Sequence, residues 1–170
     1  MGKSGFFWKS EFQKRGTRSL FRGVNRLNLD AKGRLAVPTR YRERLQEGCA
    51  SELVVTIDRD HCLLIYPLPE WQEIERKLMK LPSFNKAARN LQRLLVGHAT
   101  EVEMDGQGRV LLPPALRDFA RLEKHVVLIG QGNKFELWDE DRWNSQRADW
   151  LDEVNLEDLD LPADLETLSI

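Results

Sequence analysis

The chain contains an internal repeat, and a repeat limits the possible folds more strongly than any other feature of a sequence. The segment Leu29–Pro38 aligns with Met104–Pro113 at an offset of 75 residues. Over 16 aligned positions the copies share five identities, whereas random pairing would give about one. The identical pairs are Asp30/Asp105, Gly33/Gly108, Arg34/Arg109, Pro38/Pro113 and Arg42/Arg117. The repeat predicts two equivalent units, over 24–71 and 100–143.

Each unit has the pattern of a β-hairpin, a short helix and a second β-hairpin. An Asp opens a four-residue turn in each copy and can accept backbone N–H groups, while the Gly that ends the turn supplies a positive φ. A proline then starts a short helix, over 38–45 and over 113–120. Runs rich in Val, Ile and Leu predict the remaining strands at 53–57, 62–66, 125–129 and 134–138.

The segments outside the two units are predicted to be mainly helical. Pro69 starts a helix that runs into the linker 72–99, where Pro82 breaks it and Ser83 caps the next helix. Asp139 caps a helix that runs into the segment 144–170 and is followed by an acidic tail. A 45-residue unit alone would leave sheet edges open, so two units are expected to interlock. The fold class is therefore α+β, mainly β, with linker and C-terminal helices.

Charge is distributed unevenly along the chain. Residues 1–50 carry 12 Lys and Arg against 4 Asp and Glu, whereas residues 149–170 carry 8 acidic residues and no basic ones. A basic first third indicates a surface that binds a polyanion such as nucleic acid. The alternative is a solvated basic face that the acidic tail balances.

The sequence offers little support for an enzyme. The three histidines, His61, His98 and His125, are not in the spacing of a metal site, and no glycine-rich phosphate loop is present. Two cysteines form no disulfide framework, and no apolar run is long enough to cross a membrane. We therefore expect no catalysis, no metal, no cofactor, no small-molecule substrate and no membrane association.

Arg34 and Arg109 are the most informative side chains, because each directly follows the glycine of a turn. Such an arginine can pair with the turn Asp four residues earlier, reach across a subunit interface, or contact a phosphate or a guanine edge. Asp30, Asp105 and Arg109 are accordingly candidates for stabilising the turns or for an interface. The matched pair Arg42 and Arg117 favours a structural role.

The residues around the two arginines differ between the copies. Arg22, Arg26 and Lys32 flank Arg34, whereas Glu101 and Glu103 precede Arg109. The first unit is therefore predicted to be the DNA-binding one, with Arg34, Lys32, Arg22 and Arg26 as contacts, and the second unit to be scaffold.

Several segments resemble the MraZ family: Phe21-Arg22-Gly23, Asn28 to Pro38, Leu64 to Trp71, Gly97-His98-Ala99 and Met104 to Arg109. The resemblance covers about 21–150. It implies two AbrB-like swapped-hairpin units that form a pseudo-dimeric barrel. Each unit carries an Asp-x-x-x-Arg motif, here Asp30…Arg34 and Asp105…Arg109.

The resemblance also implies a function. Members of this family are cytoplasmic, nucleoid-associated transcriptional regulators that form ring-like homo-oligomers. They bind double-stranded DNA at promoter repeats upstream of the division and cell wall gene cluster, and repress this operon, which includes their own gene. Arg34 matches the arginine that contacts DNA. The rival hypothesis is an oligomeric interaction protein that binds no DNA and has its motif arginines at subunit interfaces.

Residues 1–20 form a basic extension that we expect to be disordered. Leu20 stands where family members place their initiating Met, so one hypothesis is that translation begins at position 20. The other is a basic arm that follows DNA phosphates.

Overall fold

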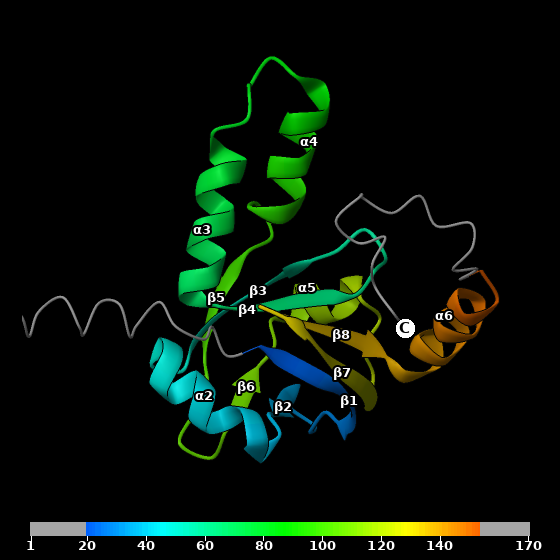
Figure 1. Ribbon diagram of the computed structural model, residues 1–170. Helices are drawn as coiled ribbons and strands as arrows, with labels where there is room; N and C mark the ends of the chain where they lie inside the picture. Colours follow the sequence, from blue (N-terminus) through cyan, green and yellow to red (C-terminus); the bar gives the residue numbers. More distant parts are fainter. Residues whose placement is uncertain (1–19, 154–170) are drawn as a thin grey trace, which may run out of the picture.

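The computed structural model describes residues 20–153, so the expectations for residues 1–19 and for most of the acidic tail lie outside the described residues. The architecture is α+β, with antiparallel strand pairing and five helices in this range (Figure 1). The strands are β1 (Phe21–Asn28), β2 (Arg34–Ala36), β3 (Glu52–Ile57), β4 (Leu63–Pro67), β5 (Thr100–Glu103), β6 (Arg109–Leu111), β7 (His125–Gly132) and β8 (Phe135–Asp139). The helices are α2 (Thr39–Cys49), α3 (Leu68–Met79), α4 (Lys86–Leu95), α5 (Pro114–Phe119) and α6 (Glu140–Glu153).

Strand pairing crosses between the two units. A six-stranded sheet has the order β1-β7-β8-β4-β3-β5, so the first strand of each unit pairs with a strand of the other. A separate two-stranded ribbon is formed by β2 and β6, again one strand from each unit. The pseudo-dimeric barrel expected from the family resemblance does not appear as a closed sheet in residues 20–153, because β1 and β5 remain as the two edges.

The six-stranded sheet separates two apolar layers. Along β3, Leu53, Val55 and Ile57 join the main core, which is completed by residues of α2, α5 and the β2–β6 ribbon. Val54, between them in sequence, packs on the opposite face with residues of α3 and α4. Helix α6 covers the β7–β8 part of the sheet, where Trp143 packs against Val127 and Trp138. Val54 faces away from Leu53 and Val55 because successive side chains of a strand point to opposite faces of the sheet.

Most local expectations are confirmed at the helix starts. Pro38 and Pro113 directly precede α2 and α5, and the Asp139 carboxylate accepts the N–H of Arg142 at 3.1 Å at the start of α6. The expected Ser83 cap is wrong. The N-cap of α4 is Asn85, whose side-chain oxygen accepts the N–H of Ala88 at 3.2 Å.

The hairpin expected from the strands 125–129 and 134–138 is confirmed: Gln131 N–H donates to the Lys134 carbonyl at 2.9 Å and Gly132 has a φ of 77°. However, β7 is longer than expected and continues through Gly132. Its end pairs with the beginning of β1, and Phe21 stands opposite Gly132 in the register. A neighbouring strand from the other unit thus extends a segment whose glycines locally favour a turn.

Cys49 and Cys62 are buried free thiols, and burial raises the pKa of both. Within residues 20–153 the structure contains no group of three or more potential metal ligands. No helix in that range is both long and apolar enough to cross a bilayer.

Candidate nucleic-acid interface

The first turn is organised by the carboxylate of Asp30. One oxygen of this carboxylate accepts the backbone N–H groups of Lys32 and Arg34, each at 2.9 Å. The other oxygen accepts Nε of Arg34 at 2.6 Å. Gly33 closes the turn with a φ of 79° and donates its N–H to the Asp30 carbonyl at 3.0 Å. The predicted roles of Asp and Gly in the turn are both confirmed.

The second turn repeats this geometry. Asp105 accepts the N–H groups of Gln107 and Arg109 at 2.9 Å and Nε of Arg109 at 3.0 Å. Each motif arginine thus uses Nε to pair with its own turn. Neither Arg34 nor Arg109 makes a hydrogen bond through its terminal nitrogens to another described residue. These nitrogens remain available to an external acceptor.

The turns lower the pKa of their carboxyl groups. The backbone hydrogen bond from Arg34 is the largest cause at Asp30, followed by weaker lowering contributions from the Arg34 side chain and Lys32, and the pKa falls from 3.8 to about 2. At Asp105 the N–H of Arg109 has the same effect and lowers the pKa. Hydrogen bonds to a carboxylate favour its charged form, so both turns hold their Asp residues ionised.

The ribbon places both motif arginines on one face. Arg34 lies opposite Leu111, and Arg109 lies opposite Ala36. The central pair, Leu35 and Val110, is buried in the main core. Because side chains alternate along a strand, the four flanking residues share the other face of the ribbon. Leu111 on that face is 56% exposed, which marks it as a solvent-facing surface.

The two turns are clamped by arginines from the opposite units. The guanidinium of Arg117 lies against Gly33, while that of Arg42 lies against Gly108. Backbone bonds accompany these contacts, since Val37 N–H donates to the Gly108 carbonyl at 2.8 Å and Leu112 N–H to the Gly33 carbonyl at 3.1 Å. The structural role predicted for this matched arginine pair is confirmed.

The other predicted DNA contacts are not all gathered at the ribbon. Lys32 is exposed in the first turn and lines an open groove of about 490 Å³ together with Glu101 and Glu103. Glu101 and Glu103, which precede Arg109 in the sequence, therefore also lie near the first turn. Arg22 is exposed on β1.

Arg26 is held at helix α6. Its guanidinium pairs with Glu140 at 2.8 Å and donates to the Asn144 side chain at 3.0 Å. Helix α6 packs on β7 and β8, away from the ribbon in the layering described above. As a DNA contact, Arg26 would first have to leave Glu140.

A polar network that sequence reasoning missed fastens β1. Tyr41 Oη donates to the Arg22 carbonyl, and Arg40 donates to Tyr41 Oη at 2.8 Å. Asn25 donates to Tyr41 Oη and to the Leu128 carbonyl, both at 3.1 Å. The repeat contained a signal for this network, because Ala115 and Leu116 replace Arg40 and Tyr41 in the second copy.

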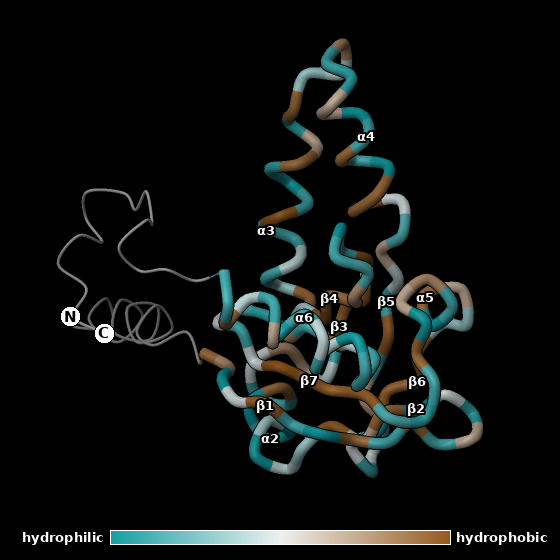
Figure 2. Tube along the Cα trace, turned by 90° about the vertical axis from the view of Figure 1, so that its right-hand side faces the viewer, coloured by the Kyte–Doolittle hydropathy of each residue, from teal (hydrophilic) through white to brown (hydrophobic). Residues whose placement is uncertain are grey.

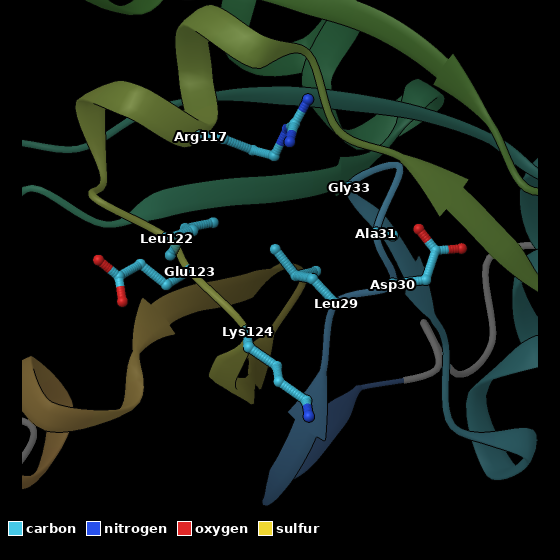
Figure 3. Close-up of a pocket in the computed structure, with 8 residues that line it drawn as sticks. All are labelled: Leu29, Asp30, Ala31, Gly33, Arg117, Leu122, Glu123 and Lys124. Atoms are coloured by element: carbon cyan, nitrogen blue, oxygen red, sulfur yellow. The ribbon is translucent and has the colours of Figure 1, made fainter.

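A second open pocket, of about 420 Å³, lies where the first turn meets the segment Leu122–Lys124 (Figure 3). Asp30 and Glu123 bring acidic groups to its lining, and Arg117 and Lys124 bring basic ones. The N–H of Leu29 donates to the Lys124 carbonyl at 2.8 Å along this seam. The balanced charges and the backbone bond identify the pocket as the junction between the two units.

Comparison with known proteins agrees with the repeat. The family described as "MraZ protein, putative antitoxin-like" matches the chain twice, over residues 20–94 and 95–160. The "Transcriptional regulator MraZ" of Halorhodospira halophila is 62% identical over 152 residues, which cover 89% of this chain and 100% of that protein. The protein of the same name from Thioalkalivibrio sulfidiphilus is 61% identical over 151 residues, covering 89% and 100%.

A more distant relative gives the same result. The "Transcriptional regulator MraZ" of Legionella pneumophila (strain Corby) is 56% identical over 153 residues, again covering 89% of this chain and 100% of the relative. With two tandem domain matches and relatives that align over their whole length, the chain belongs to the MraZ family of transcriptional regulators.

Proposed function

We propose that this protein is a sequence-specific DNA-binding repressor that acts on its own operon in the division and cell wall gene cluster. It binds repeated sites upstream of that cluster as a ring-like homo-oligomer, in the cytoplasm and associated with the nucleoid. It carries out no catalysis and uses no cofactor. The observation that carries the proposal is the β2–β6 ribbon with both motif arginines on its exposed face.

The ribbon has the form of a major-groove reader. The major groove of B-DNA admits a two-stranded β-ribbon, and arginine can bind the O6 and N7 atoms of guanine with two hydrogen bonds. Arg34 is anchored through Nε, so its terminal nitrogens can serve this contact without losing the bond to Asp30. Lys32 lies two residues away in the same turn and can neutralise a phosphate.

Arg22 and Arg26 are proposed as secondary contacts to the DNA backbone. Both are exposed on β1, although Arg26 is engaged by Glu140 in the free protein. Arg109 shares the ribbon face with Arg34 and is therefore proposed to assist it, in addition to stabilising its own turn.

Oligomerisation is proposed because one ribbon offers few base contacts. Several subunits on successive sites about one helical turn (~10 bp) apart would raise the affinity through multivalency. Large apolar side chains on the helices remain exposed and could supply subunit contacts, namely Leu94 and Leu151. Light scattering at micromolar concentration is expected to give several times the monomer mass. A monomer would contradict both the ring and the multi-site binding.

A footprint of the purified protein on its own upstream region tests the proposal. Regularly spaced protected sites are expected, and raising the salt concentration should steeply weaken binding because phosphate contacts release counterions. If the oligomer forms but protects no site at low salt, the DNA-binding proposal fails and the motif arginines are interface residues.

A further inference from the structure

Helices α3 and α4 form a hairpin that stands away from the sheet (Figures 1 and 2). The base of the hairpin is fastened, because Trp71 packs in the same buried cluster as Val54 and Thr56 donates to the Leu95 carbonyl at 2.6 Å. The two helices are also tied together, since the Gln92 side chain donates to the Leu78 carbonyl at 2.8 Å. The distal part is thus a rigid projection from the domain.

This distal part is strongly basic. The segment 76–93, from the end of α3 to the end of α4, contains six Lys and Arg residues and no Asp or Glu. Arg76 is paired with Glu73 at 3.1 Å, and Arg89 donates to the Ser83 carbonyl at 2.8 Å. The other four are exposed and have no ion pair with any residue in 20–153: Lys77, Lys80, Lys86 and Arg93.

The tip of the hairpin is also apolar. Phe84 in the connecting loop is 86% exposed, and Met79 at the end of α3 is 59% exposed. Large apolar side chains beside unpaired cations favour an occupant that is both acidic and apolar. Duplex DNA would use the cations but leave Phe84 and Met79 in water.

The chain itself contains a segment of this chemistry. Residues 154–170 include five Asp and Glu, five Leu and no Lys or Arg. They follow α6, which packs on the same face of the six-stranded sheet as α3 and α4. Seventeen residues can span up to about 56 Å when extended, whereas a domain of this size has a radius of gyration of about 14 Å. The tail can therefore reach its own hairpin.

We propose that the acidic, leucine-rich segment 154–170 docks on the basic α3–α4 hairpin of the same copy. Its carboxylates pair with the exposed cations of the distal segment, and its leucines cover Phe84 and Met79. The same copy is favoured over a free molecule because a short tether gives the tail a millimolar effective concentration at its own hairpin. A neighbouring subunit of the proposed ring is the alternative that the isotope test below distinguishes. The proposal is independent of DNA binding.

Zero-length carbodiimide cross-linking of the full chain tests the proposal, because it joins a lysine amine to a carboxylate only when the two are in contact. An equimolar mixture of ¹⁴N- and ¹⁵N-labelled protein is unfolded in urea and refolded together, so that each oligomer contains both labels, and is then cross-linked, digested and analysed by mass spectrometry. We expect Lys77, Lys80 or Lys86 to be joined to acids within 157–166, in peptide pairs that carry a single isotope. Mixed-isotope pairs would show that the tail belongs to a neighbouring copy and would overturn the proposal.

A charge-reversal pair supplies the matched control. Lys80→Glu combined with Lys86→Glu should reduce the cross-links from the remaining Lys77 at least tenfold. Arg59→Glu combined with Lys124→Glu changes the net charge equally at exposed positions outside the hairpin and should leave the yield unchanged. Equal loss in both variants, or no hairpin-to-tail cross-link in the parent protein, would overturn the proposal. In the latter case, a hairpin that protects duplex DNA in the footprint would assign these cations to nucleic acid instead.

Discussion

The guanidinium of Arg117 lies against Gly33, in the space that a Cβ atom at this position would occupy. Arg42 has the same relationship to Gly108, so each unit places an arginine over the turn of the other. Arg117 is held there by donation of Nε to the Leu112 carbonyl at 3.2 Å. The two turns that carry the Asp-x-x-x-Arg motifs are therefore fixed by contacts between units as well as by their own hydrogen bonds.

The first prediction follows from this clamp. Gly33→Ala should lower the free energy of unfolding by about 1–2 kcal/mol, because φ is positive and the new methyl group displaces Arg117. Urea denaturation measures the loss. Gly106→Ala is the matched control, since Gly106 lies in the equivalent turn with no atom within 4 Å of the added Cβ and no positive φ. Equal stability of the two variants would contradict the clamp.

The second prediction concerns the arginines of the ribbon. Arg34→Ala should weaken specific DNA binding by roughly 5- to 150-fold per site, the range of about 1–3 kcal/mol for a bidentate base contact. Its effect on folding should be below about 1 kcal/mol, because the pair with Asp30 lies at the surface. Fluorescence anisotropy on the footprinted site measures the binding.

Arg109→Ala is the matched control for Arg34→Ala. Its pair with Asp105 is similarly exposed, but Gln107 replaces Lys32 in its turn, so the loss of affinity should be smaller. If Arg34→Ala binds as tightly as the parent protein, the arginine serves only its turn.

The third prediction concerns acid stability. The pKa of Asp30 is lower in the folded protein than in the unfolded chain, so its stabilising contribution is complete above pH 4 and is lost as the pH falls toward 2. Asp30→Asn should therefore lower the melting temperature at neutral pH but flatten its decline between pH 4 and 2. Scanning calorimetry across this range checks the slope. An unchanged slope would show that the turn does not stabilise the carboxylate.

The fourth prediction concerns the base of the α3–α4 hairpin. Thr56→Val removes the donor to the Leu95 carbonyl from a fully buried site and should cost about 1–2 kcal/mol of unfolding free energy. Hydrogen exchange in α4 should accelerate in parallel. Thr100→Val removes an exposed bond to the His98 carbonyl and should change stability by less than about 0.5 kcal/mol. A comparable cost in both variants would exclude a special role for Thr56.

The sequence by itself determined the repeat, the two Asp–Gly turns and the helices that follow Pro38 and Pro113. These features are local, because a turn carboxylate, a glycine with positive φ and a proline at a helix start act within a few residues. The basic character of the first third was also visible, but the spatial neighbours of its side chains were not. Arg26 pairs with Glu140, which lies 114 residues away in the chain.

Only the tertiary structure decided which strands are partners. An alternation of apolar and polar residues predicts a strand but does not predict which other strand it pairs with. Here β1 pairs with β7, and β2 pairs with β6. The ribbon formed in this way puts Arg34 and Arg109 on one face, although the sequence assigned them to a DNA-binding unit and a scaffold unit. The physical reason is that neither unit satisfies its strand edges alone, so the pairing is set by contacts between units.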